Sequence, residues 1–214
     1  ALGFYITKHP LTQYESLVRG LASHEISSLK QLGDGQRIVL GGLIAKLRTV
    51  PIKTGRNAGK KMLIATLEDF SGAIEVVVFS EQLPEFQHLL RPDAVVFIDG
   101  SVDRRREEPS IRATRIIPVE DAQRELARSV VLRLQSTGGP LDSLPEVQTL
   151  CRQHRGRCEV YLEIAGPDGG WVATVRSRQS LAVELNEQLL AQLGGLPGVQ
   201  GVYLCGPRGY VSAG

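Results

Sequence analysis

The sequence of 214 residues predicts mainly β and α+β structure in two folded parts. The first part is a five-stranded barrel, and the second is a small domain with a βαββαβ order of elements. The barrel is predicted by a series of alternating apolar segments, interrupted after the third by a short amphipathic segment. The second domain is predicted by two helical apolar stripes that lie between further strand-like segments.

The expected barrel lies between residues 36 and 118. Both faces of its first strand are apolar or small, and the Gly41–Gly42 pair permits the sharp bend that a small barrel requires. Gly72 supplies the left-handed position of a short hairpin. Leu83 and Phe86 belong to the apolar stripe of a helix that would close the barrel at its bottom. The expected elements are strands at 37–48, 62–67, 73–79, 94–102 and 110–118, and a helix at 81–90.

Three strands, a helix and two strands in this order form the OB-fold. This barrel binds oligonucleotides on the face of strands two and three, and with the loops that follow strands one and four. In this sequence those two loops are the most basic parts of the segment, so we expect salt-sensitive binding to phosphates. The candidate binding residues are Arg48, Lys53, Arg56, Lys60, Lys61, Arg104, Arg105, Arg106 and Arg112, with Phe70 at the hairpin turn.

The aromatic residues of the barrel predict little base stacking. Proteins that bind single strands stack bases on aromatic side chains. Phe79, Phe86 and Phe97 lie in apolar patterns typical of a core, which leaves Phe70 as the candidate for stacking. We therefore expect weak and mostly electrostatic binding.

Residues 129–214 are expected to form the α+β domain. Its strands are predicted at 129–135, 158–164, 171–175 and 199–205. Apolar stripes at 141–151 and 181–193 predict two helices, and Gly194–Gly195 ends the second. The order βαββαβ indicates a split βαβ arrangement.

Two segments flank the expected barrel. Residues 1–35 form a lead-in from a preceding domain, with a helix before residue 21 and a polar connector from 22 to 35. Residues 119–128 form a short helical connector to the second domain. The chain begins at Ala1 without an initiator methionine and is interpreted as a piece of something longer.

Charge, cysteine spacing and hydropathy argue against several classes of protein. The formal net charge is +2, so any basic surface must be local. Cys151, Cys158 and Cys205 lack the spacing of a zinc site or a disulfide framework and are expected to be buried, reduced thiols. No apolar run approaches the roughly 18 residues of a membrane span, and no signal-peptide pattern opens the chain. We expect a cytoplasmic protein without membrane contact.

No catalytic or metal-ligating constellation is visible. The four histidines are scattered, and none has a ligand-like spacing to a cysteine. Glu68 and Asp69 are adjacent and are typical of a turn rather than of a catalytic carboxylate pair. The sequence therefore predicts no catalytic residue, no metal site and no cofactor.

The segments Leu2–Leu11, Ala65–Phe79 and Asp99–Val102 together resemble parts of one family, the bacterial replicative DNA polymerase III alpha subunit. The first is Leu2–Leu11, LGFYITKHPL, which in that family lies just ahead of the OB domain. The second is Ala65–Phe79, ATLEDFSGAIEVVVF, which is similar to the OB signature, and the third is Asp99–Val102, which is similar to the fourth strand. Residues 129–214 correspond in position and element order to the C-terminal domain of that subunit.

The resemblance implies a C-terminal fragment of a DNA-directed DNA polymerase, a nucleotidyltransferase. The metal-bound aspartates of such an enzyme, which would use magnesium, lie in an upstream domain, so this fragment itself is expected to be non-catalytic. The implied partners are single-stranded template DNA at the OB-fold, the clamp-loader tau subunit at the C-terminal domain, and the sliding clamp through the parent chain.

Two other functions compete with this one. The barrel could be an anticodon-type OB module that binds RNA, or a protein-docking module whose OB face is unused. In addition, Gln82–Phe86 resembles a Gln-Leu-x-x-Phe peptide that docks on sliding clamps. Because Leu83 and Phe86 are also needed to close the barrel, we take the core as the stronger interpretation of that segment.

Overall fold

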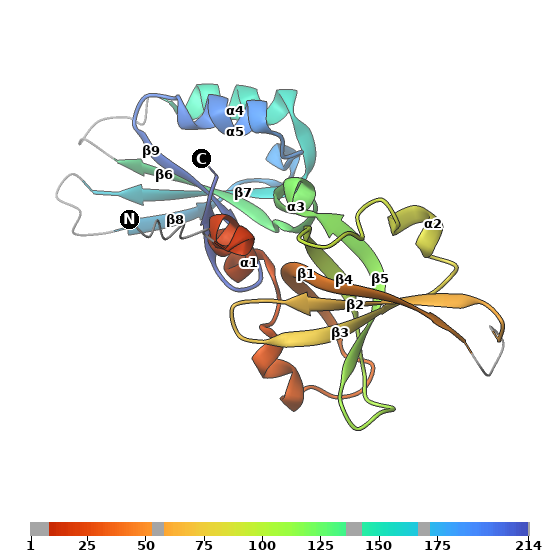
Figure 1. Ribbon diagram of the computed structural model, residues 1–214. Helices are drawn as coiled ribbons and strands as arrows, with labels where there is room; N and C mark the ends of the chain where they lie inside the picture. Colours follow the sequence, from red (N-terminus) through yellow and green to blue (C-terminus); the bar gives the residue numbers. More distant parts are fainter. Residues whose placement is uncertain (1–8, 53–57, 136–142, 167–171, 214) are drawn as a thin grey trace, which may run out of the picture. The chain divides into compact units, whose positions relative to one another are not determined.

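The structure is a computed structural model that describes residues 9–52, 58–135, 143–166 and 172–213. The chain divides into two compact units, Ala1–Asp121 and Ala122–Gly214. Figure 1 shows a barrel in the first unit and a sheet with helices in the second. The segment expected as a helical connector, 119–128, holds a 3-10 helix, Val119–Asp121, and the helix α3, Ala122–Leu126.

The predicted OB-fold barrel is confirmed. Its strands close in the order β1-β2-β3-β5-β4, and all neighbours are antiparallel except β3 and β5. The parallel contact is short and joins residues 75–77 to residues 110–112. The strands are β1 Arg37–Pro51, β2 Lys61–Glu68, β3 Ala73–Val78, β4 Val95–Asp103 and β5 Ser110–Pro118.

The first strand serves two neighbours because it bends near its middle. Residues 37–43 of β1 pair with β4, and residues 43–51 pair with β2. Gly42 lies at the changeover, where an added Cβ would come within 2.5 Å of the carbonyl oxygen of Glu68. The glycine therefore permits a close backbone approach that a side chain would block.

A short helix closes the barrel, as predicted, but it is shorter than expected. The helix α2 spans Leu83–Phe86, and Phe86 is 5% exposed within the barrel core. After Phe86 the amide groups of Leu89 and Leu90 bond to carbonyls three residues back, which are 3-10 turns. Leu90 still packs into the same core, so the apolar stripe closes the barrel without a continuous α-helix.

The lead-in differs from the sequence expectation. It holds a 3-10 helix, Pro10–Tyr14, then α1, Glu15–Leu21, and a second 3-10 helix, Ile26–Gln31. The interpretation of 22–35 as a polar connector is wrong, because Ile26 and Leu29 are buried in the barrel core. Two apolar residues in a single short turn produce no periodicity that could have revealed this.

The second unit has the predicted βαββαβ order with one addition, the short strand β10. Its sheet has the order β10-β9-β6-β7-β8, and α4 and α5 pack on one face of it (Figure 1). The elements are β6 Ser129–Gln135, α4 Leu144–Gln153, β7 Arg155–Ala165, β8 Val172–Arg176, the 3-10 helix Gln179–Leu181, α5 Glu187–Gly194, β9 Val199–Cys205 and β10 Tyr210–Ser212.

The pairing in this sheet corrects the split βαβ expectation. The strands β6 and β7 pair directly in parallel, whereas a split arrangement requires another strand between them, and β8 pairs instead with the outer edge of β7. An order of elements alone does not fix which strands are neighbours, so the sequence could not separate the two arrangements.

The second long helix also begins later than its leucine pattern suggests. The Asn186 side chain accepts a hydrogen bond from the Leu189 amide at 2.8 Å and caps α5. The preceding Val183 and Leu185 are buried, and Val183 forms isolated bridges to β7. The leucine spacing from 181 to 193 fits a single helix, but the chain around Val183 is extended and only the later part, from Glu187, is α-helical.

Two of the three cysteines are buried, as expected. Cys151 and Cys158 lie in the core of the second unit, and burial raises the pKa of Cys158 to about 12. Cys205 is half-buried. None of the helices in the described ranges is both long and apolar enough to cross a membrane.

Candidate nucleic-acid interface

A groove of about 550 Å³ lies on the outer face of the barrel, between the β1–β2 loop and the β4–β5 loop. We call it the loop groove. It occupies the position at which OB-folds bind oligonucleotides. The residues that line it include Val50, Ile52, Met62, Val77, Phe79, Arg105, Arg106 and Arg112.

The floor of the loop groove is apolar because of strand alternation. On β3, Ile74, Val76 and Val78 point into the barrel core, so Val77 and the following Phe79 point outward. The expectation that Phe79 belongs to the core is wrong, because this half-buried ring lines the groove and is not packed against the core cluster. Sequence alternation on β3 is the signal that could have identified it.

Two of the candidate cations are already paired with acids. Arg48 forms an ion pair with Glu75 across the outer face of β1, β2 and β3. Lys60 lies 3.4 Å from a carboxylate oxygen of Glu81. Both pairs are exposed, and such pairs are weak, so a phosphate can compete for either cation.

Asp103 holds two further cations at the wall of the loop groove. Its carboxylate accepts a hydrogen bond from Arg105 Nε at 2.9 Å and one from Arg112 at 3.2 Å. These hydrogen bonds, with Arg105 the largest contributor, hold the pKa of Asp103 well below its usual range. The two guanidinium groups therefore lie beside the apolar floor, with one negative charge between them.

The arginine triplet of the β4–β5 loop divides into different roles. The Arg104 side chain donates to the backbone carbonyls of Leu29, Lys30 and Leu32, and so ties the loop to the lead-in. Arg106 lines the groove and, like Lys61, forms no ion pair with an acid in the described ranges. Of the triplet, Arg105 and Arg106 therefore lie at the groove, while Arg104 is used within the protein.

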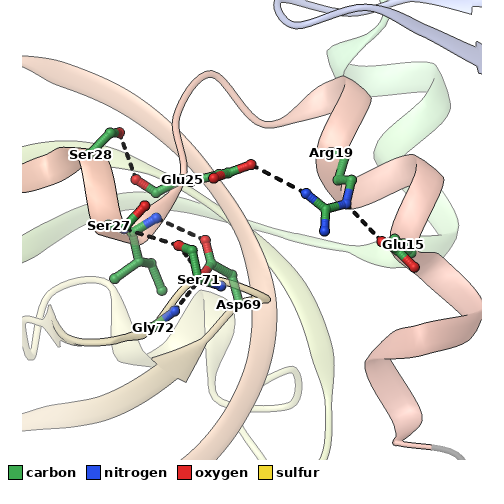
Figure 2. Close-up of polar contacts among 9 residues, drawn as sticks. Glu15, Arg19, Glu25, Ser27, Ser28, Asp69, Ser71 and Gly72 are labelled. Atoms are coloured by element: carbon green, nitrogen blue, oxygen red, sulfur yellow. Dashed lines mark hydrogen bonds and ion pairs between the residues drawn. The ribbon is translucent and has the colours of Figure 1, made fainter.

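Phe70 lies at the opposite end of the β2–β3 hairpin, away from the loop groove. It is 38% exposed, and the Arg19 guanidinium lies 5.1 Å from its ring centroid. Arg19 is held in turn by Glu15 and Glu25, as Figure 2 shows. The structure therefore does not bring Phe70 together with the other candidate residues.

Hydrogen bonds to the Asp69 side chain stabilise the hairpin turn beside Phe70 (Figure 2). One carboxylate oxygen accepts from the amides of Ser71 and Gly72 and from the Ser71 hydroxyl, and the other accepts from the Ile26 amide at 2.8 Å. The Ser71 hydroxyl oxygen accepts from the Ser27 amide at 3.0 Å. The turn thus fixes the lead-in on the barrel, a role that the sequence does not reveal.

Lys53 and Arg56 lie outside the described residues, so their positions relative to the groove stay predictions. Among the residues that the structure does describe, no group of His, Cys, Asp and Glu side chains is placed to hold a metal ion.

The second unit presents a different surface. The sheet face opposite α4 and α5 carries Tyr161, Tyr203 and Tyr210, which alternate with strand residues that pack against the helices. Arg133 lies 4.9 Å from the Tyr203 ring centroid and pairs with Glu163 at 3.0 Å. Tyrosine and arginine are enriched at protein interfaces.

The comparisons with known proteins agree with this architecture. A family model described as an OB-fold nucleic acid binding domain, of the tRNA anti-codon type, matches residues 38–119. Several relatives are DNA polymerase III alpha subunits. That of Pseudomonas fluorescens is 36% identical over 169 residues, which cover 78% of this chain and 14% of that protein.

Two further relatives match nearly the whole chain. The alpha subunit of Pseudomonas aeruginosa is 34% identical over 95% of this chain, and that of Bacillus subtilis is 29% identical over 95%. In both cases the match covers 17% of the relative. The chain therefore spans about a sixth of the length of these proteins.

Proposed function

This chain belongs to the family of bacterial DNA polymerase III alpha subunits, whose C-terminal OB-fold region it matches, and from that premise we propose that its barrel binds single-stranded DNA in the loop groove. The chain would act as a non-catalytic part of a polymerase, holding template strand while catalysis takes place elsewhere in the parent protein.

The observation that carries the proposal is that the loop groove has cationic side chains around an apolar floor. Arg105, Arg106 and Arg112 line the same groove as Met62 and Phe79. Cations attract phosphates of any nucleic acid, but an apolar floor is matched by bases that are exposed, and bases are exposed only in a single strand. The combination therefore favours a single strand over a duplex.

Fluorescence anisotropy with labelled oligo-dT, a duplex of equal length and oligo-U tests the proposal. We expect oligo-dT to bind more tightly than the duplex, with an affinity that falls steeply as salt rises. Equal or tighter binding of the duplex would count against the proposal. A clear preference for oligo-U would instead support the anticodon-type alternative.

A charge variant locates the cations that meet phosphates. Replacing Lys53, Arg56, Lys60 and Lys61 together by alanine should flatten the dependence of log affinity on log salt by about 0.7 for each phosphate that is no longer neutralised. A matched control removes four exposed arginines of the second unit, Arg152, Arg155, Arg157 and Arg178. If both variants change the slope equally, phosphate binding is not specific to the β1–β2 loop.

The non-catalytic part of the proposal has its own test. Primer extension and nuclease assays with magnesium or manganese should show no product with this chain alone. Nucleotide incorporation by the purified chain would overturn this part.

We propose further that the second unit contacts the clamp-loader tau subunit through its tyrosine-bearing sheet face. The support is the pair Tyr203 and Tyr210, whose rings meet edge to face at 6.3 Å, beside Arg133. Calorimetry with a tau subunit should show binding that Tyr203→Ala and Tyr210→Ala together weaken, because central aromatic residues dominate such interfaces. Unchanged affinity of this double variant for tau would show that the tyrosine-bearing face is not the contact surface, and the face that carries α4 and α5 would be tested next.

A further inference from the structure

We infer that Phe79 is a platform on which one base of the bound strand stacks, so that binding has a component that salt does not remove. This inference rests on the proposed function and names a contact within the same groove. It differs from the sequence expectation, in which binding is mostly electrostatic and Phe79 is part of the core.

The other phenylalanines of the described barrel do not line the loop groove. Phe86 and Phe97 are 5% and 0% exposed and lie inside. Phe70 is covered on one side by Arg19, at the far end of the hairpin. Phe79 alone among these four is half-buried in the loop groove, where the ring contributes nothing to the core cluster.

The neighbours of Phe79 suit a stacked base. Val77 and Met62 extend the apolar floor beside the ring, and Ile52 adds to it from the start of the β1–β2 loop. A flat base on this floor would contact apolar atoms over its whole face. Bases of every type have such a face, so the contact would be tolerant of sequence.

Arg112 connects the base contact with the phosphate contact. Its guanidinium lies 5.8 Å from the Phe79 ring centroid and is also held by Asp103 at 3.2 Å. Two stacked contacts of about 3.5 Å each require about 7 Å, so a base enters between ring and guanidinium if Arg112 moves outward by about 1 Å. The Arg112 side chain is 46% exposed, and it can make this movement toward a phosphate.

The test compares Phe79→Leu with the wild-type chain on two ligands, oligo-dT and an abasic oligonucleotide of the same length. Leucine keeps an apolar side chain but has no aromatic face. We expect Phe79→Leu to bind oligo-dT about tenfold more weakly, with an unchanged salt slope, because one stacking interaction is removed and no charge is changed. The abasic ligand should bind both proteins equally.

Each outcome separates the inference from the proposed function. If the wild-type chain binds neither ligand at low salt, the proposed function fails. If it binds oligo-dT but Phe79→Leu binds with the same affinity, only the platform fails. Phe79→Tyr, which retains a ring, should bind oligo-dT like the wild type, and a loss there equal to that of Phe79→Leu would also overturn the inference. Circular dichroism melting shows that each variant is folded at the assay temperature.

Discussion

The two ends of the β2–β3 hairpin carry the same kinds of residue but use them differently. At the turn end, Arg19 lies against Phe70, and at the loop-groove end, Arg112 lies against Phe79. At the turn end the polar groups are occupied by the protein itself, since Asp69 and Ser71 bind the amides of the lead-in. At the loop-groove end, Phe79 and Arg106 line open space.

The difference shows that a phenylalanine with an arginine does not by itself mark a binding site. Phe70 is more conspicuous in the sequence, because it lies in a turn, whereas Phe79 continues an apolar strand. What distinguishes the two is whether neighbouring elements already satisfy the groups around them. The lead-in does so for Asp69 and Ser71 at the turn end, although a separate groove of about 1050 Å³ also lies beside that turn, whereas Phe79 and Arg106 line the loop groove.

The largest expected effect comes from an aromatic residue with a purely structural role. Phe86→Ala removes a ring from the barrel core and should lower the free energy of unfolding by about 3–5 kcal/mol. Below its melting temperature the variant should bind oligo-dT normally, in contrast to Phe79→Leu. Thermal melting and anisotropy measure the two properties. A normal melting temperature with reduced affinity for a sliding clamp would instead identify Gln82–Phe86 as a docking peptide.

The turn end should respond to Asp69→Ala in stability and not in DNA binding. The change removes four hydrogen bonds that fix the turn and the lead-in, and we expect a loss of about 2 kcal/mol, as for a missing helix cap together with an unsatisfied amide. Ser71→Ala, which removes fewer of these bonds, should lose less. Weaker oligo-dT binding at a temperature where Asp69→Ala is folded would contradict the proposed division between the two ends.

The sequence is sufficient to predict those features of the fold that depend on the local pattern of apolar residues. Strand alternation predicts the barrel, and the stripe with Phe86 predicts its closure. The positions of the two basic loops follow from the strand order, and the loop groove lies between them. These features depend on the local period of apolar residues, which sequence displays directly.

The remaining features depend on contacts between distant parts of the chain. Arg104 is bound to carbonyls more than seventy residues earlier, so its position in a basic triplet gives no sign of its role. Asp69 is a turn residue by composition but also holds Ile26, across 43 residues. The apolar neighbours of Phe79 predict a core position, although alternation from Val78 places it outside. Side-chain partners at this range are set by the fold and not by local pattern.

At the loop-groove end, Asp103 should make stability depend on pH. Since hydrogen bonds from Arg105 lower its folded-state pKa, ionised Asp103 stabilises the fold above its unfolded-state value of about 3.9. This contribution is lost as pH falls from about 4 toward the folded-state pKa. The melting temperature of wild type should therefore exceed that of Asp103→Asn by a constant amount between about pH 5 and 8, and the difference should shrink below about pH 4. A constant difference down to the lowest pH would show that the carboxylate charge is not responsible.

The smallest expected effect concerns the far side of the β4–β5 loop. A second groove of about 1050 Å³ lies there and shares Arg106 and Ser110 with the loop groove, but Glu107 and Glu108 line only the second one. Neither glutamate forms an ion pair with a described residue, so both charges would repel a strand that continued past Arg106.

Replacing both glutamates by glutamine should therefore tighten oligo-dT binding about threefold at low salt, as expected for exposed charges worth a few tenths of a kcal/mol each. The gain should disappear near 1 M salt, where the screening length is about 3 Å. Glu146→Gln with Glu187→Gln changes the net charge equally on exposed helix positions of the second unit and should have less effect. If that control tightens binding as much, the glutamates act only through net charge. If neither does, the strand does not approach this side of the loop, and the acidic groove plays no part in defining its path.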